Sequence, residues 1–393
     1  MALRLPPLWL LIGISAIGPV VMNGVVPANS AVMAEFQVRY GTVQLVLTVF
    51  MLASLFGQIV LGVGADRYGR RPIILLSMVM FSISGFLCAA ANSMEWLLAG
   101  RFVQGFFGSA LLILPRTIVR DVFGREKAAS MIGYMTMAMM VAPLFGPAVA
   151  GWTVDNYSWR WMYVGFGVFG AVFSVLIFFF MHETRSDDSP ADVPVTLLAA
   201  SAKLFRLPAF NAIAAMMSGS VGVYYSFLAG SPYVMMESRG FGASEFGLWF
   251  TMVAVGYFTG NLIAGRFSET RGVHKMISFG AIPGLTAVVL FWLFSGLTHP
   301  IGLFLPMFCV ALSNGISLPN LMSAVMSVDP KLMSSASGLA GALQVALGVV
   351  LTYSLGLLLP SSDYWLFVFI TVSALLWVAG LLAWHRLPNT DHR

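Results

Sequence analysis

The chain has 393 residues, of which 59% are hydrophobic and only 9% are charged. Soluble proteins carry roughly 25% charged residues, so this composition excludes a water-soluble protein. The formal net charge of +5 does not indicate nucleic-acid binding, because cytoplasmic loops of membrane proteins collect Lys and Arg and acidic residues are few here.

Apolar segments long enough to cross a bilayer follow one another along the chain. A spanning helix needs about 20 apolar residues, which leaves room for about twelve spans and little else. The first apolar segment follows Arg4 and looks like a signal peptide, but it continues to about Val26, too far for one that is cleaved. We predict spans at roughly 8–28, 43–63, 73–92, 96–118, 131–153, 160–181, 210–232, 244–265, 277–296, 300–322, 335–358 and 364–385.

The longest polar stretch, residues 182–206, divides these spans into two sets. We therefore expect an N-terminal six-helix bundle over 1–181, a cytoplasmic linker over 182–206 and a C-terminal six-helix bundle over 207–393. Both termini are predicted to be cytoplasmic, because this orientation places Lys and Arg inside, as short loops require. The exceptions among the 21 Lys and Arg residues are Arg39, Arg101, Arg160 and Arg239.

The two sets also resemble each other at a fixed offset. Pro27 corresponds to Pro232, and Leu114-Pro115-Arg116 corresponds to Leu318-Pro319-Asn320. Matches in one register favour parallel repeats. The predicted fold is an all-α membrane protein with two pseudo-symmetric six-helix bundles.

A charged segment between the second and third predicted spans has the most specific pattern. Four charges within six residues cannot lie in hydrocarbon, so we predict a tight cytoplasmic loop in which glycines allow a sharp turn. The residues that we expect to form a conformational latch here are Gly62, Asp66, Arg67, Gly69, Arg70 and Arg71.

Two further motifs lie inside spans. Arg101, with Gln104 and Gly105, places a charge about one turn inside the fourth span, where it either extends to the outer surface or lines a cavity. The fifth span combines prolines, which kink a helix, with glycines, which let a neighbouring backbone approach. Its motif residues are Pro143, Gly146, Pro147 and Gly151.

Polar and aromatic side chains in other spans are candidates for a substrate cavity, although such residues more often serve only helix packing. They are Asn23, Arg116, Tyr224, Tyr225, Asn314, Asn320 and Gln344.

The loop of Gly62–Arg71 resembles the signature between spans two and three of the major facilitator superfamily. Arg101-x-x-Gln104-Gly105 resembles its span-four motif, whose arginine is linked to proton coupling, and Gly146-Pro147-x-x-x-Gly151 resembles a motif of its drug–proton antiporters. The whole chain resembles the bicyclomycin/chloramphenicol resistance (Bcr/CflA) transporters, which implies a bacterial inner-membrane location. The segments that carry this resemblance are His182-Glu183-Thr184, Gly230-Ser231-Pro232-Tyr233, Ser313-Asn314-Gly315, Leu318-Pro319-Asn320 and Ser337-Gly338-Leu339 with Gly341, Leu343 and Gln344.

One position departs from that family. Its members usually carry an acidic residue four positions before the proline that ends span one, whereas this chain has Asn23 before Pro27. No Asp, Glu or His falls near the middle of a predicted span. Protons then couple through Glu35 or Asp121, or the substrate carries a titratable group, or protons are not used; we favour an unusual coupling route. Without a facing acid, we expect neutral or anionic substrates to be preferred over lipophilic cations.

The leading hypothesis is an exporter of drug-like or small metabolite molecules by alternating access, with proton antiport. The alternative is an uptake permease or facilitator for a nutrient or siderophore-like compound. An enzyme is not expected, because no catalytic triad, metal-ligand spacing or phosphate loop is present. We expect no cofactor, no metal and no nucleic-acid partner, and a monomer in the lipid bilayer; Cys88 and Cys309 suggest no disulfide.

Overall fold

The computed structural model describes residues 6–139, 141–184, 197–329 and 332–386, with side chains placed in these ranges except at 120–134, 136–144, 197–200 and 334. In this part of the chain every regular element is a helix, which confirms the predicted all-α fold. The helices form two compact units. Unit 1 comprises Met1–Pro190 and Pro232–Thr251, and unit 2 comprises Ala191–Ser231 and Met252–Arg393.

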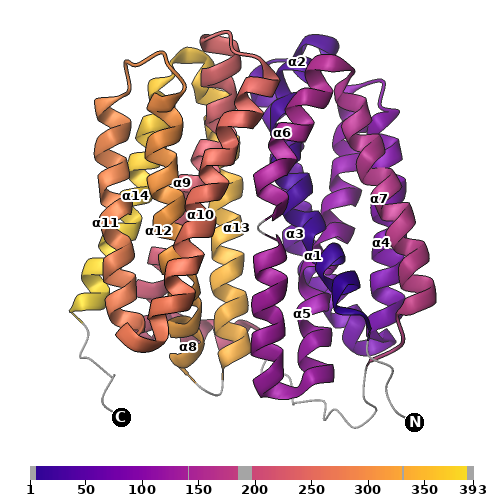
Figure 1. Cartoon of the computed structure of the whole chain (residues 1–393), viewed down its shortest axis with the longest axis vertical. Helices are drawn as coiled ribbons and strands as arrows, with labels where there is room; N and C mark the ends of the chain where they lie inside the picture. The colour runs from indigo at the N-terminus through magenta and orange to yellow at the C-terminus, as the bar shows by residue number, and fades with distance from the viewer. Residues whose placement is uncertain (1–5, 140, 185–196, 330–331, 387–393) are drawn as a thin grey trace. The chain divides into compact units, whose positions relative to one another are not determined.

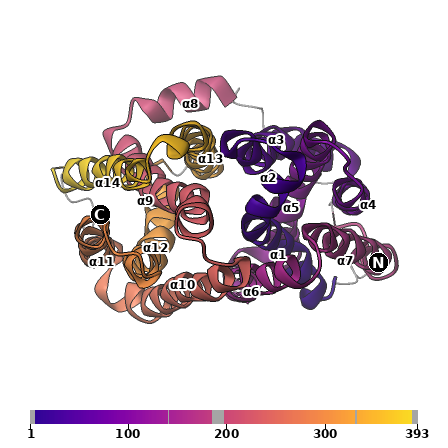
Figure 2. The same cartoon turned by 90° about the horizontal axis from the view of Figure 1, so that it is seen from above.

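Unit 1 is built around one central helix. In Figure 2, α5 lies among α1, α3 and α4, and these packing partners are its main neighbours. The helix α7 covers α4, and α6 packs on α1. The elements of unit 1 are α1 Leu8–Gly24, η1 Val26–Ala28, α2 Asn29–Phe36, α3 Tyr40–Tyr68, α4 Arg70–Ala89, α5 Met94–Met139, α6 Val141–Asn156, α7 Trp159–Phe180 and the π-helix η2 Tyr233–Ser238.

The core of unit 1 fills the space between these helices with large apolar side chains. Ile14 of α1, Phe81 of α4, Leu111 of α5 and Ile177 of α7 are buried together. The opposite sides of the same helices remain apolar and exposed, as on Val172 of α7. Such helices are apolar on all sides, as expected for membrane spans.

Unit 2 has a corresponding layer of helices. The helix α12 packs against α11 and α13, and α14 packs against α11 and α13. Its core includes Phe210, Met216, Leu321 and Trp377. The helices are labelled in Figure 1, and α10 belongs to unit 2 from Met252. The elements are α8 Leu197–Phe205, α9 Pro208–Pro232, α10 Ala243–Arg271, α11 Val273–Leu293, α12 Ile301–Ser327, α13 Met333–Leu358, η3 Leu359–Ser361 and α14 Tyr364–His385.

Eleven helical segments of the described chain are long and apolar enough to cross a membrane. The remaining predicted span, residues 131–153, covers the end of α5 and most of α6, and residue 140 between them is outside the described part of the chain.

The helix α5 is longer than predicted. Its apolar part, Met94–Val119, matches the fourth span, but the helix continues to Met139 through residues that we expected to form a loop. This segment contains Arg, Glu, Lys, Ala and Met, which favour helix, and its two glycines do not end it.

The connection from α3 to α4 is shorter than the predicted loop. The helix α3 runs to Tyr68 and α4 begins at Arg70, so that Gly69 alone makes the turn. Its φ of +104° is a conformation that favours glycine. In unit 2, Gly272 makes the same turn from α10 to α11 with a φ of +82°. The charged turn and the corresponding turn of unit 2 therefore share one geometry, as parallel repeats predict.

Candidate functional site

The turn at Gly69 gathers the charged residues of the predicted latch. Asp66, in the last turn of α3, forms an ion pair with the guanidinium of Arg70 in the first turn of α4. The Asp66 side chain is exposed, whereas that of Arg70 is largely covered. Arg67 and Gly62 lie on α3, and the position of a Cβ at Gly62 is open. The arginine guanidinium of Arg67 lies 5.4 Å from the ring centre of Tyr68.

A residue that sequence reasoning did not place in the site completes this turn. The carboxylate of Glu183, just after α7, accepts hydrogen bonds from the backbone N–H groups of Arg70 at 2.9 Å and Arg71 at 3.2 Å. It thereby satisfies two of the free N–H groups at the start of α4, where a negative charge is also favoured by the helix dipole. The only signal in the sequence was the His182-Glu183-Thr184 segment, which was noted as a resemblance.

Packing at the turn leaves no room for a larger residue. A Cβ at Gly69 would collide with the carboxylate of Glu183. Arg71 donates to the backbone oxygen of Phe178 at 2.8 Å, which connects the start of α4 to the end of α7 a second time. The turn therefore joins three helices, α3, α4 and α7, through two carboxylates and two arginines.

The span-four arginine is fully buried inside unit 1. Arg101 donates from Nε to the backbone oxygen of Val46 at 3.1 Å and from a terminal nitrogen to Oε1 of Gln104 at 2.6 Å. Its guanidinium lies 4.2 Å from the ring centre of Phe50 and 6.0 Å from that of Tyr163. The sequence left two positions open for this side chain, the outer surface and the lining of a cavity. The outer surface is excluded, because the side chain has no exposed area.

The surroundings of Arg101 balance its charge only in part. Among the described residues no carboxylate forms an ion pair with it, and carbonyl, amide and aromatic groups supply the negative partners. Its second terminal nitrogen, the Gln104 Nε2 and the Tyr163 hydroxyl are buried without a hydrogen-bond partner in the described structure. Buried donors without partners are costly. This cluster is therefore a high-energy polar site within the membrane-spanning part.

Gly105 has a packing role beside this cluster. A Cβ at Gly105 would collide with the backbone of Phe50, so α3 and α5 approach closely at this point. The Ser54 hydroxyl donates to the Gly105 oxygen at 3.0 Å across the same contact. Close approach at small residues is how spanning helices associate. The span-four motif thus combines a buried charge with the glycine that holds its helix against α3.

The kinked fifth span contacts the opening turns of α10, which belong to unit 1. A Cβ at Gly151 would collide with the backbone of Ala243, and one at Gly247 would collide with the backbone of Pro147. Asp155 Oδ2 accepts from the backbone N–H of Ser244 at 2.7 Å. These contacts hold the end of α6 against the start of α10.

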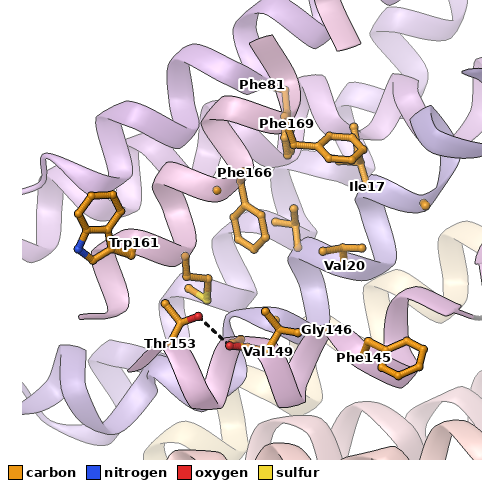
Figure 3. Close-up of a pocket in the computed structure, with 16 residues that line it drawn as sticks. Ile17, Val20, Phe81, Phe145, Gly146, Val149, Thr153, Trp161, Phe166 and Phe169 are labelled. Carbon is orange, nitrogen blue, oxygen red and sulfur yellow. Dashed lines mark hydrogen bonds between the residues drawn. The ribbon is translucent and has the colours of Figure 1, made fainter. Parts of the chain in front are cut away.

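The other two residues of this motif are Pro143 and Gly146. The Pro143 side chain is outside the described part of the structure, although its backbone is in α6. The space around a Cβ at Gly146 is open. Instead, Gly146 lines a pocket of about 460 Å³ between α1, α6 and α7, which Figure 3 shows.

The candidate cavity residues of unit 1 lie in contrasting environments. Asn23 is buried at the end of α1, and its amide nitrogen donates to the Pro19 oxygen at 2.8 Å. Arg116 is exposed on α5. Neither residue approaches the buried Arg101 cluster within hydrogen-bond distance.

The candidates of unit 2 are mostly bonded within their own helices. Asn320 is buried and donates to the Ile316 oxygen at 2.7 Å, and the half-buried Gln344 donates to the Ala340 oxygen at 3.2 Å. Asn314 is different, because its amide oxygen accepts from the Ser220 hydroxyl and so joins α12 to α9. The rings of Tyr224 and Tyr225 are half-buried with centres 5.9 Å apart.

The coupling candidates lie away from the middle of the spans. Glu35, at the end of α2, forms an ion pair with Arg160 and accepts from Trp159 Nε1 at 2.6 Å. The Asp121 side chain lies outside the described part of the structure. All carboxylates whose side chains are described lie in or next to the first or last turns of helices or in η2: Glu35, Asp66, Glu95, Asp155, Glu183, Glu237, Glu245, Glu269, Asp329 and Asp363. In this part of the chain no group of acidic, His or Cys residues could hold a metal ion.

Comparisons with known proteins agree with this architecture. The family model described as Major Facilitator Superfamily matches residues 8–352. The chain is 26% identical to the bicyclomycin resistance protein homolog of Haemophilus influenzae, over 86% of this chain and 85% of that protein. It is 28% identical to multidrug resistance protein D of Escherichia coli, over 90% of this chain and 89% of that protein.

The fold is also found among solved structures. A bacterial homolog of the human lysosomal transporter Spinster has a TM-score of 0.75 at 16% identity, with 96% of this chain and 97% of that chain covered. The resemblance read from the sequence motifs is confirmed, and a transporter, not an enzyme, is indicated. From the family match over most of its length, the chain belongs to the major facilitator superfamily of membrane transporters.

Proposed function

We propose that this secondary transporter exports drug-like or small metabolite molecules across the bacterial inner membrane by alternating access, in exchange for protons. Export is supported by the names of two relatives, a bicyclomycin resistance homolog and a multidrug resistance protein. The structural observation that carries the proposal is the contact of the Gly146–Gly151 motif with α10, since Gly151 leaves no space against Ala243. Close packing of α6 against α10 at this glycine can prevent solute from leaking between the two helices during the transport cycle.

In this proposal the turn at Gly69 is the conformational latch and faces the cytoplasm with both termini. Arginines at Arg67, Arg70 and Arg71 fit that side of the membrane. The two six-helix bundles at 1–181 and 207–393, joined through 182–206, are the bodies that alternate. We further propose that the transporter works as a monomer.

The charge that we expect the substrate to carry follows from the buried arginine, Arg101. Arg101 has no ionised partner among the described residues, so its surroundings carry positive potential. A cationic substrate would meet that potential without a carboxylate to offset it. We therefore propose that neutral or anionic molecules are preferred, with Asn23, Arg116, Tyr224, Tyr225, Asn314, Asn320 and Gln344 as cavity residues.

A second candidate, an uptake permease or facilitator, is favoured by one observation. Every carboxylate with a described side chain lies near a helix end or in η2, whereas proton antiport normally uses a buried carboxylate. Glu35 is the described coupling candidate, but its ion pair with Arg160 stabilises the charged form and opposes proton uptake.

The deciding experiment is accumulation of labelled chloramphenicol in efflux-deficient bacteria that express the protein. Export in exchange for protons predicts lower accumulation than in cells without the protein, and recovery when a protonophore is added. Accumulation that is unchanged, with the protein shown to be inserted, contradicts drug export. Lower accumulation that resists the protonophore retains export and contradicts proton coupling.

A further inference from the structure

The pocket between α1, α6 and α7 has a shape and lining that the transport cycle does not explain. Its volume is about 460 Å³, within the range of roughly 300–1,000 Å³ found for small-molecule sites. All of its lining residues belong to unit 1.

The pocket has a buried floor and an exposed rim. Ile17, Val21 and Phe81 form part of the floor and are almost fully buried. Phe145 and Trp161 belong to the rim and are more than half exposed, at 58% and 60%. In a chain that spans the membrane, an exposed apolar rim on α6 and α7 suits access from lipid and not from water.

Five of the lining residues are aromatic. Phe81, Phe145, Trp161, Phe166 and Phe169 come from α4, α6 and α7, and Figure 3 shows Phe166 projecting into the space between α1 and α6. The ring of Phe166 packs edge-on against Tyr163, at 6.0 Å between centres, and Phe169 stacks on Phe173 at 4.2 Å. Rings held in this way favour a planar aromatic guest, because aromatic pairs gain more than buried area alone.

The uncharged lining restricts further the class of molecule that can bind. Among the described residues of the lining none is charged, so an ion would lose its hydration without a partner. The single hydroxyl of the lining in the described part of the chain is that of Thr153, which donates to the Val149 oxygen at 2.8 Å. A hydroxyl that has donated its proton can still accept. The described lining residues also offer no cation to a phospholipid headgroup.

From these features we infer that the pocket is a binding site for uncharged aromatic molecules dissolved in the bilayer, with Thr153 accepting a hydrogen bond from the guest. The inference does not depend on export or on proton coupling. It requires only that unit 1 spans the membrane.

The pocket can be blocked by substitutions that do not disturb the core. A Cβ at Gly165, on the pocket side of α7, meets no atom within 4 Å. Gly165→Leu therefore fills the pocket from an open position. Val149→Phe enlarges an exposed rim residue and provides a second blocking variant. Val172→Leu is the matched control, because Val172 is exposed on the same helix but does not line the pocket.

The probe is 3-trifluoromethyl-3-phenyldiazirine, an uncharged aromatic photolabel, applied to the full chain in lipid nanodiscs. N-phenyl-1-naphthylamine, which is uncharged and has one N–H donor, serves as the competitor. We expect labelling of residues 145–153 and 161–169 that the competitor displaces. Labelling should fall at least about fivefold in both blocking variants and stay unchanged in Val172→Leu, while Thr153→Val should weaken the competitor about fivefold through one lost hydrogen bond.

Three outcomes would overturn the inference. Labelling spread evenly over exposed apolar faces, without displacement by the competitor, would mean ordinary exposure to lipid. Displacement by added phospholipid but not by N-phenyl-1-naphthylamine would assign the pocket to acyl chains. Undiminished labelling in folded Gly165→Leu and Val149→Phe would place the bound label elsewhere. None of these readings uses transport, so a failure of the export proposal leaves the test intact.

Discussion

The carboxylate of Glu183 accepts a hydrogen bond from the backbone N–H of Arg70 at 2.9 Å and so caps α4 from the end of α7. Two segments more than a hundred residues apart thereby share one helix terminus. The turn at Gly69 depends on this cap as well as on its own arginines.

Removing the cap should weaken the turn. Glu183→Ala leaves the first N–H groups of α4 without their acceptor, which costs about 0.5–2 kcal/mol for a helix cap. Thermal unfolding in detergent should shift to lower temperature, and transport should fall. Glu183→Gln keeps one acceptor oxygen and should lie between Ala and the original chain. Glu95→Gln, an exposed carboxylate in the first turn of α5, is the control and should change neither.

Breaking the ion pair of the latch should affect the cycle more than the fold. Asp66 is exposed, so its pair with Arg70 contributes little to stability, as is usual for surface pairs. Asp66→Ala should therefore insert and unfold normally but lose most of its transport. Full transport by Asp66→Ala in cells with matched expression would remove the latch role.

The stability of the protein should depend on the hydrogen-bond acceptor that residue 104 offers to Arg101, and not only on the volume of that side chain. Gln104→Leu takes the acceptor from a buried guanidinium nitrogen, at a cost of about 1–3 kcal/mol. Gln104→Glu supplies a charged acceptor at the same distance and should keep or raise stability. Unfolding temperatures of the two purified variants provide the comparison. Equal destabilisation by Leu and Glu would show that Gln104 acts through packing alone.

Two glycines of the kink motif should respond differently to alanine. At Gly151 a Cβ collides with Ala243, and overpacking of this kind costs about 1–3 kcal/mol. At Gly146 the same change meets open space and should be nearly neutral. Paired measurements of unfolding and of solute leak in proteoliposomes test the contrast. A greater effect of Gly146→Ala than of Gly151→Ala would contradict the sealed contact with α10.

An acid at position 23 should make cation transport depend on pH. The amide of Asn23 donates to the Pro19 oxygen, and a carboxyl group can do the same only when protonated. Asn23→Asp should therefore transport a quaternary ammonium drug better as pH rises, because the ionised form attracts the cation. Asn23→Gln retains an amide and is the control. Unchanged cation transport over the whole pH range would count against position 23 as a substrate contact.

Much of the architecture could be predicted from residue patterns, because hydrocarbon restricts spanning segments to apolar helices. The position of Gly69 at a sharp turn was also readable, since few other residues adopt its φ. Helix ends were less predictable: α3 and α5 continue into charged segments where water and the chain's own hydrogen bonds stabilise a helix as well as a loop.

Tertiary partners were the least predictable part of the site. Glu183 was read as a linker residue, since only the folded chain brings it to α4. Likewise, nothing local distinguishes Gly151, which has no free space, from Gly146, which borders a pocket. Spacing along one helix determines a face, but the identity of the neighbour depends on distant segments. For the same reason, the sequence alone does not determine whether the Arg101 side chain lies at the surface or in the interior.

The glycine turns at Gly69 and Gly272 have a mechanical consequence. Successive Cα atoms are about 3.8 Å apart, so a one-residue connection keeps the ends of the two helices within about 7 Å of each other and leaves no slack. A displacement of α3 along its axis must be transmitted to α4 at once, and the same holds for α10 and α11. The two helices of each pair are therefore rigidly coupled at their turn, and any bending during the transport cycle has to occur elsewhere along these helices.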